Sequence, residues 1–188
     1  VPIARLEESS FEDGFGFELG RALEARGIHP DLLVKTSEMQ TFTYTKVINS
    51  ITGVEDMPRL DFINNRPMPE RVEGEVLARL RTNFSSFDVI IVGDQAETGA
   101  GGVVTPAVRD LLGVLASQHP GKTVLVDSRM RVDLFRGVAV KPNEQEAEAA
   151  CRRSFGRIDY QALRRQAGAP FVYVTHGPKG VLVVEESG

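Results

Sequence analysis

The chain has 188 residues, of which 41% are hydrophobic and 26% are charged, and its formal net charge is −4. These values predict one globular domain with an ordinary core. The weak negative charge gives no basic field for nucleic acid, and no apolar run approaches the ~20 residues of a membrane helix, so we expect neither kind of partner. The single cysteine, Cys151, excludes a disulfide within the chain and fits a cytoplasmic location.

The first elements in chain order are a helix and a short strand. Residues 9–26 predict the helix, with Ser9 or Ser10 as its N-cap and Gly27 closing its end. Residues 32–35 predict the short strand. No internal repeat or low-complexity segment interrupts this part of the chain.

A hairpin arm is predicted next. Residues 42–48 and 57–63 are rich in aromatic, β-branched and other apolar residues, and the link between them, residues 52–56, has turn composition. We interpret residues 41–63 as a lid hairpin inserted in the single domain of residues 1–188, which we expect to be incomplete at both ends.

After Pro67 and Pro69 the pattern changes to alternating helices and strands. Helices are predicted at residues 70–81, 106–118 (with Thr105 as N-cap), 143–153 and 159–166. Continuous apolar strands are predicted at residues 88–92, 123–126, 138–140, 171–174 and 181–184. This alternation predicts an α/β fold with a mostly parallel sheet and helices on both faces.

Polar residues follow four of these predicted strands. They are Gly93-Asp94, Asp127-Ser128-Arg129, Lys141-Pro142-Asn143-Glu144 and Thr175-His176-Gly177. Open parallel sheets bind ligands beyond the carboxyl ends of their strands, so these residues predict a ligand-binding edge. The alternative is that they only cap strands and begin loops.

The segment Lys141-Pro142-Asn143-Glu144-Gln145-Glu146 carries the most chemistry. Asn143 and Glu146 are three residues apart, so a helix that starts here places both on one face, and its N-terminal N–H groups can hold a phosphate. Glu146 can hold Mg²⁺ through waters. The alternative is a capping box, with Asn143 as N-cap and Glu146 as its partner. The two roles are compatible.

Two motifs together resemble the PfkB family of ribokinase-like sugar kinases. They are K-P-N-x-x-E at residues 141–146 and V-T-x-G-x-K-G at residues 174–180. The resemblance implies a three-layer α/β/α ribokinase-like fold with a small β lid arm, and ATP- and Mg²⁺-dependent phosphorylation of a carbohydrate hydroxyl. It also implies that Asn143 and Glu146 shape the Mg²⁺–phosphate site, and that Thr175, Gly177 and Lys179 contact the nucleotide.

Further segments resemble the heptose-phosphate kinase branch of that family, the kinase domain of ADP-heptose synthase. They are Thr45-Lys46-Val47, Arg59-Leu60-Asp61-Phe62, the strand ending at Gly93-Asp94, and Asp127-Ser128-Arg129. The resemblance implies that Lys46 and Asp94 face the sugar or sugar phosphate, and that the lid arm forms a homodimer with a second subunit.

The chain departs from the family pattern in one segment that matters for catalysis. The family's G-A-G-D segment supplies the catalytic base, and we expect its aspartate beyond Gly188. Gly99-Ala100-Gly101-Gly102 is similar but lacks the aspartate, and we predict a flexible loop there. Two alternatives stay open: a nucleoside or vitamin kinase of the same fold, and a non-catalytic ribokinase-like protein with a binding or regulatory role.

Overall fold

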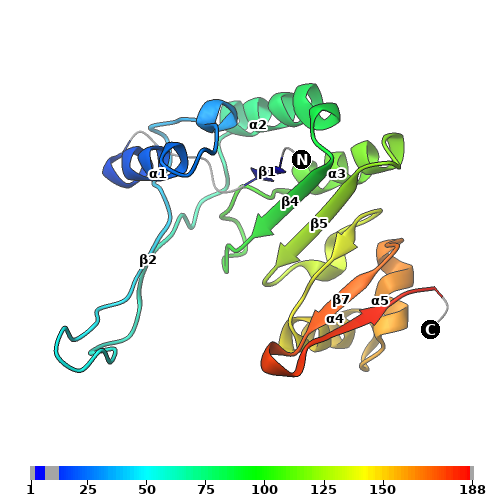
Figure 1. Cartoon of the computed structure of the whole chain (residues 1–188). Coiled ribbons are helices and arrows are strands. Elements are labelled where there is room, and N and C mark those ends of the chain that lie inside the picture. Colours follow the sequence, from blue (N-terminus) through cyan, green and yellow to red (C-terminus); the bar gives the residue numbers. More distant parts are fainter. Residues whose placement is uncertain (1–2, 7–12, 187–188) are drawn as a thin grey trace.

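The computed structural model describes residues 3–6 and 13–186, which contain a six-stranded sheet (Figure 1). The strand order is β1-β4-β5-β6-β7-β8; the pairs from β1 to β7 are parallel, and β8 is antiparallel to β7. The strands are β1 (Ile3–Leu6), β4 (Val89–Asp94), β5 (Thr123–Ser128), β6 (Ala139–Val140), β7 (Val172–Thr175) and β8 (Val181–Val184). The carboxyl ends of the parallel strands therefore lie along one edge.

The described part of the chain contains five helices, α1 (Gly14–Glu24), α2 (Glu70–Asn83), α3 (Pro106–Gln118), α4 (Glu144–Phe155) and α5 (Tyr160–Ala167), with 3-10 turns η1 (Pro30–Leu32), η2 (Phe84–Ser86), η3 (Val132–Leu134) and η4 (Gly177–Lys179). Four of the five described helices, α2 to α5, bury apolar residues in the core, whereas α1 buries only Gly16. Helix α3, for example, buries Val108, Leu111, Leu112 and Leu115, the spacing of one helical face. None of the helices that the structure describes is long and apolar enough to cross a membrane.

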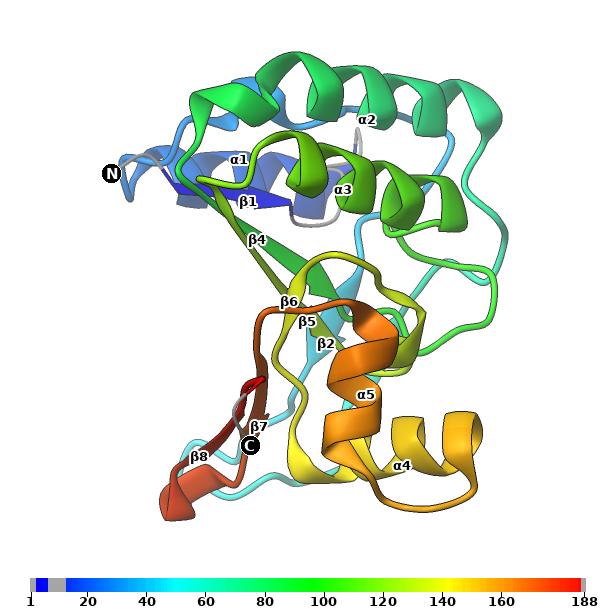
Figure 2. The same ribbon diagram turned by 90° about the vertical axis from the view of Figure 1, so that its right-hand side faces the viewer.

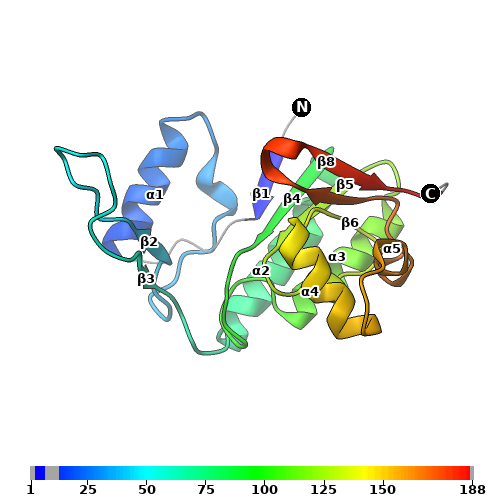
Figure 3. The same ribbon diagram turned by 90° about the horizontal axis from the view of Figure 1, so that it is seen from below.

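Helices α2, α3, α4 and α5 lie on one face of the sheet, as Figures 2 and 3 show from two sides. That face buries Ile90 and Val92 of β4 and Val124 and Val126 of β5. On the opposite face, Leu125 and Tyr173 are only half-buried, and they border a groove of about 670 Å³. The continuous apolar runs predicted strands buried on both faces. In the structure, β4, β5 and β7 instead alternate between buried side chains on the helix-covered face and mostly half-buried ones on the other.

The predicted hairpin pairs as expected. Strands β2 (Thr43–Thr45) and β3 (Leu60–Phe62) are antiparallel, with Tyr44 opposite Asp61. In Figure 1 this two-stranded arm projects away from the sheet, on the side toward which the β4 and β5 arrows point.

The predicted fold class is confirmed: a mostly parallel sheet with flanking helices, consistent with a three-layer α/β/α architecture, and a small β arm. One detail differs from the prediction of helices on both faces: within the described residues, α2 to α5 cover one face, and the opposite face carries the groove (Figures 2 and 3). Nine predicted elements from residue 70 onward match observed ones, with ends that differ by two residues at most. Helix α3, its N-cap Thr105 and strand β8 begin and end where predicted. These segments have long apolar runs and clear capping residues.

The N-terminal predictions were partly wrong. Helix α1 starts at Gly14, because Asp13 is the N-cap and accepts a hydrogen bond from Gly16 N at 2.7 Å. Ser9 and Ser10, the predicted caps, lie outside the described residues. Residues 32–35 form no strand: Pro30 starts the turn η1, and Arg79 holds the carbonyls of Asp31 and Leu33 at 3.0 and 2.9 Å.

Two further features differ from the predictions. Strand β1 was not predicted, since its four residues mix apolar and charged side chains, yet it pairs with β4 in the register Ile3 to Val89. The loop of residues 99–102 was predicted to be flexible. Instead, Gly101 and Gly102 are buried, and Gly101 N donates a hydrogen bond to Thr98 Oγ1 at 2.8 Å.

Candidate functional site

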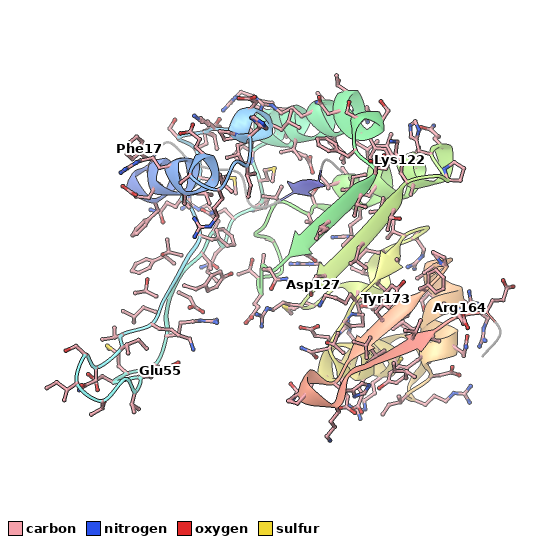
Figure 4. The ribbon with its side chains drawn as sticks, viewed as in Figure 1. Phe17, Glu55, Lys122, Asp127, Arg164 and Tyr173 are labelled. Carbon is pink, nitrogen blue, oxygen red and sulfur yellow. The ribbon has the colours of Figure 1, made fainter. Side chains whose placement is uncertain are left out.

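The polar strand ends meet along the carboxyl edge of the sheet. Asp94 lies in register with Ser128 on β5, and Asn143 forms a bridge with Thr175 at the end of β7. Thr175 N donates a hydrogen bond of 3.0 Å to Pro142 O, which joins the K-P-N-E segment to the T-H-G turn. The sheet topology thus places residues from four strands at one edge, as the sequence predicted. Figure 4 labels Asp127 there.

Asn143 and Glu146 form a complete capping box at the start of α4. Asn143 Oδ1 accepts from Glu146 N at 2.9 Å, and Glu146 Oε2 accepts from Asn143 N at 2.8 Å. The capping role that the sequence suggested is therefore present. Oε1 of Glu146 takes no hydrogen bond from the described residues, so one carboxylate oxygen stays available to a ligand.

The T-H-G turn lies directly beside this helix start. Thr175 ends β7, and Gly177 adopts a φ of 57°, which lets the chain turn back through η4 into β8. His176 Nδ1 lies 3.3 Å from Glu144 Oε1, which links the turn to the first residue of α4. Lys179 is exposed at the end of η4. Five predicted site residues are therefore neighbours in sequence or across this junction: Asn143, Glu146, Thr175, Gly177 and Lys179.

One charged pair at the same edge was missed. Lys141 Nζ lies 2.9 Å from Asp127 Oδ2, between the ends of β6 and β5. Lys141 and Thr175 also border the groove on the sheet face. The signal was present in the sequence, since both residues directly follow apolar strands. Their pairing depends on the strand order, which was not predicted from the sequence.

The donor set at this junction suits Mg²⁺ better than a transition metal. Within residues 3–6 and 13–186, no three His, Cys, Asp or Glu side chains form a group that could enclose a metal ion. Mg²⁺ keeps several waters and needs only one or two carboxylates, and the open Oε1 of Glu146 is such a donor. The residues present therefore fit a water-mediated magnesium site.

Asp94 lies at the same edge, but its carboxylate is buried. The residue is 2% exposed, Oδ2 accepts from Ser128 Oγ at 2.6 Å, and Oδ1 accepts from Arg131 Nη1 at 2.9 Å. Both oxygens are thus committed to the protein in this structure. Sequence reasoning named Asp94 and Ser128 at two strand ends but did not pair them, and it did not name Arg131.

Lys46 lies on the arm, apart from the junction of α4 and β7. Its ammonium group pairs with Glu55 across the hairpin. Figure 4 labels Glu55 and Asp127, and shows the end of the arm well separated from the sheet edge. Near the base, Arg59 donates two hydrogen bonds to Asp61, and this contact lowers the pKa of Asp61 below its usual value.

Asp13 ties the arm to helix α1. Besides capping α1, its Oδ2 accepts a hydrogen bond from Thr41 N at 2.8 Å, just before β2. Partial burial alone would raise the pKa of Asp13, but the backbone hydrogen bonds from Thr41 and Gly16 outweigh it and hold the pKa below its usual value. The side chain is therefore an anion at neutral pH, and it fixes where the arm leaves the body of the protein.

Solved structures with the same arrangement of strands and helices identify the fold. Fructokinase from Xylella fastidiosa superposes with a TM-score of 0.62 at 15% identity, over 98% of this chain and 58% of that chain. Ribokinase from Giardia lamblia gives a TM-score of 0.59 at 15% identity, over 98% and 55% of the two chains. The chain has the ribokinase-like fold.

Two similar sequences carry the same name, bifunctional protein HldE. The chain is 29% identical over 183 residues to bifunctional protein HldE of Wolinella succinogenes, which covers 94% of this chain and 37% of the relative. It is 28% identical over 141 residues to bifunctional protein HldE of Trichlorobacter lovleyi, or 74% and 27% of the two chains. No model of a known protein family matches. The predicted resemblance to ribokinase-like carbohydrate kinases is confirmed, and the chain spans about a third of the length of these relatives.

Proposed function

We propose that the protein is a cytoplasmic, ATP- and Mg²⁺-dependent kinase that phosphorylates a hydroxyl of a sugar or sugar phosphate. The observation that carries the proposal is the junction of the capping box at Asn143 and Glu146 with the turn at Thr175. Similarity to fructokinase, to ribokinase and to HldE supports it, and one fructokinase structure from Xylella fastidiosa contains bound ATP.

The junction can hold the phosphates of a nucleotide. The first N–H groups of α4 and the positive end of its dipole attract anions, and Lys179 adds a mobile positive charge nearby. Thr175 and Gly177 would contact the nucleotide from the end of β7. Glu146, with Asn143, would hold Mg²⁺ through waters, and the ion would neutralise phosphate charge when bound.

The acceptor would lie toward the arm. We treat residues 41–63 as a lid of one kinase domain, with Lys46 as the cation that meets a substrate phosphate and Asp94 as a residue of the substrate side. The resemblance of residues 45–47 and 59–62 to the heptose-phosphate kinase branch favours a heptose phosphate or a related sugar phosphate. The proposed base is the aspartate of a G-A-G-D segment, a sequence that does not occur within residues 1–188.

A coupled ADP-release assay with MgATP tests this function. The protein would be expressed from its complete reading frame and offered ribose, fructose, fructose phosphates, heptose 7-phosphate, nucleosides and pyridoxal. We expect strong turnover with one sugar or sugar phosphate. Turnover only with a nucleoside or pyridoxal would reject the substrate class. ATP binding without any turnover would favour a non-catalytic ribokinase-like protein.

We also propose that the arm joins two subunits. Strands β2 and β3 pair with each other, which leaves the outer edge of each strand open within the described part of the chain. The arm also exposes large apolar side chains: Ile48, Ile51, Val54, Met57, Leu60 and Phe62. We expect a dimer by light scattering at micromolar concentration, and a monomer after deletion of residues 46–57. A monomeric wild-type protein would reject the dimer.

A further inference from the structure

Arg131 holds the loop that follows β4 through hydrogen bonds to the loop's own backbone. Its Nη1 donates to Ala96 O at 3.1 Å, and its Nη2 donates to Thr98 O. An irregular loop has no strand partner to satisfy its carbonyl groups, so side-chain donors must do so where the loop is buried. Ala96 is 2% exposed. Arg131 therefore fixes the path of residues 96–98.

The guanidinium of Arg131 is itself held in place by the strand ends. Nη1 pairs with Asp94 Oδ1 at 2.9 Å, with the two side chains 13% and 1% exposed. Ser128 Oγ donates to Asp94 Oδ2 at 2.6 Å and accepts from Arg131 N at 3.0 Å. The buried positive charge is thus compensated, and its partners complete a closed network. Such a network permits essentially one position for the arginine.

The same loop also reaches the base of the arm. Thr98 Oγ1 accepts from Gly101 N at 2.8 Å and donates to Asn64 O at 3.5 Å, and Asn64 follows β3. A second arginine, Arg109, donates to Val104 O at 3.0 Å near the end of the loop. The loop therefore lies between the carboxyl edge of the sheet and the start of the arm.

We propose that Arg131 is a positioning residue for the acceptor sugar: it sets the loop of residues 95–101 between the sheet edge and the arm. This inference rests on the proposed kinase function, because the loop follows the β4 strand end where open α/β sheets bind ligands. Arg131 does not touch the reacting atoms. It acts through the loop backbone, and it affects the acceptor side rather than the nucleotide junction at α4.

Three variants test the positioning role. Arg131→Lys keeps the positive charge beside Asp94. A lysine lacks the planar guanidinium, so it cannot donate to both loop carbonyls as Arg131 does. Arg131→Met removes all the contacts, and the double variant Asp94→Asn with Arg131→Met also removes the carboxylate that would otherwise be buried alone. Arg136→Met is the matched control. The Arg136 side chain also donates to backbone carbonyls, those of Asp133 and Phe135 at 2.7 Å, but these lie outside the loop of residues 95–101.

Two readouts separate positioning from a structural role. In Arg131→Lys and in the double variant, we expect amides 96–101 to exchange hydrogen at least about tenfold faster, while the core amides of β4 and β5 keep their protection. We expect the KM for the acceptor to rise about tenfold and the KM for ATP to change less than about twofold. Arg136→Met should leave both readouts at wild-type values.

Distinct outcomes overturn the inference and the kinase function. Unchanged exchange of residues 96–101 in all three Arg131 variants shows that Arg131 does not hold the loop. Faster exchange with an unchanged acceptor KM shows that the loop does not position the acceptor. If wild-type protein phosphorylates no acceptor, the kinase function fails, and the exchange rates alone then decide whether Arg131 holds the loop.

Discussion

Replacing Gly101 with alanine is expected to destabilise the protein by about 3 kcal/mol, the cost of overpacking a site that cannot easily relax. A β-carbon at this position would lie 1.9 Å from Asn64 O and 2.5 Å from Thr98 Oγ1. Asn64 O is a backbone atom, so it cannot rotate away as a side chain could. The loop and the base of the arm must separate, and urea unfolding at neutral pH measures the loss.

Gly99→Ala is the matched control in the same loop. No heavy atom lies within 4 Å of a β-carbon built at Gly99, and its φ is not in the left-handed region. We expect its free energy of unfolding to stay within about 0.5 kcal/mol of wild type. Equal losses in the two variants would show that the loop tolerates neither side chain for a reason other than the contact with Asn64.

Replacing Glu146 with glutamine is expected to separate its two roles. The amide oxygen can still accept from Asn143 N, so the capping box persists, and we expect a stability loss below about 1 kcal/mol from the weaker helix-dipole interaction. The negative charge that would hold hydrated Mg²⁺ is gone. We expect the Mg²⁺ concentration for half-maximal activity to rise at least about tenfold. Activity is measured against Mg²⁺ at saturating ATP.

Two companion variants complete this test. Glu146→Ala removes the cap as well, and it should cost about 1 kcal/mol in addition to the change in Mg²⁺ dependence. Glu148→Gln is the control on the same helix. Glu148 pairs with Arg152 at 2.8 Å, and its replacement should leave the Mg²⁺ dependence unchanged. An unchanged Mg²⁺ dependence in Glu146→Gln would make Glu146 a capping residue alone.

The sequence predicted the second half of the fold well for local reasons. Continuous apolar runs define β4 and β5, and side-chain caps such as Thr105 define where helices begin. The junction at Asn143 and Glu146 was predictable because its residues are three positions apart. Such contacts depend on helix geometry alone.

The remaining features depend on contacts between distant segments. Arg131 and Asp94 are 37 positions apart, and only the parallel pairing of β4 with β5 brings them together. The N-cap of α1 was predicted at Ser9 or Ser10, whereas the structure has it at Asp13. Asp13 also accepts a hydrogen bond from Thr41, 28 positions away, and nothing in the sequence indicated that contact. The close packing of Gly101 against Asn64 could not be predicted, since it joins two loops that lie far apart in the sequence.

The order of the strands has a consequence for how the chain folds during its synthesis. From β5 to β8, each strand pairs with the strand that precedes it in the chain. Each new strand that leaves the ribosome therefore finds its partner already made, and the sheet can lengthen at one edge through short-range contacts, which favour fast folding. The exception is β1, whose Ile3 pairs with Val89 of β4. The chain between these two residues contains α1, the arm and α2. Because closure entropy grows slowly with loop length, residues can be added to the arm at little cost to that step.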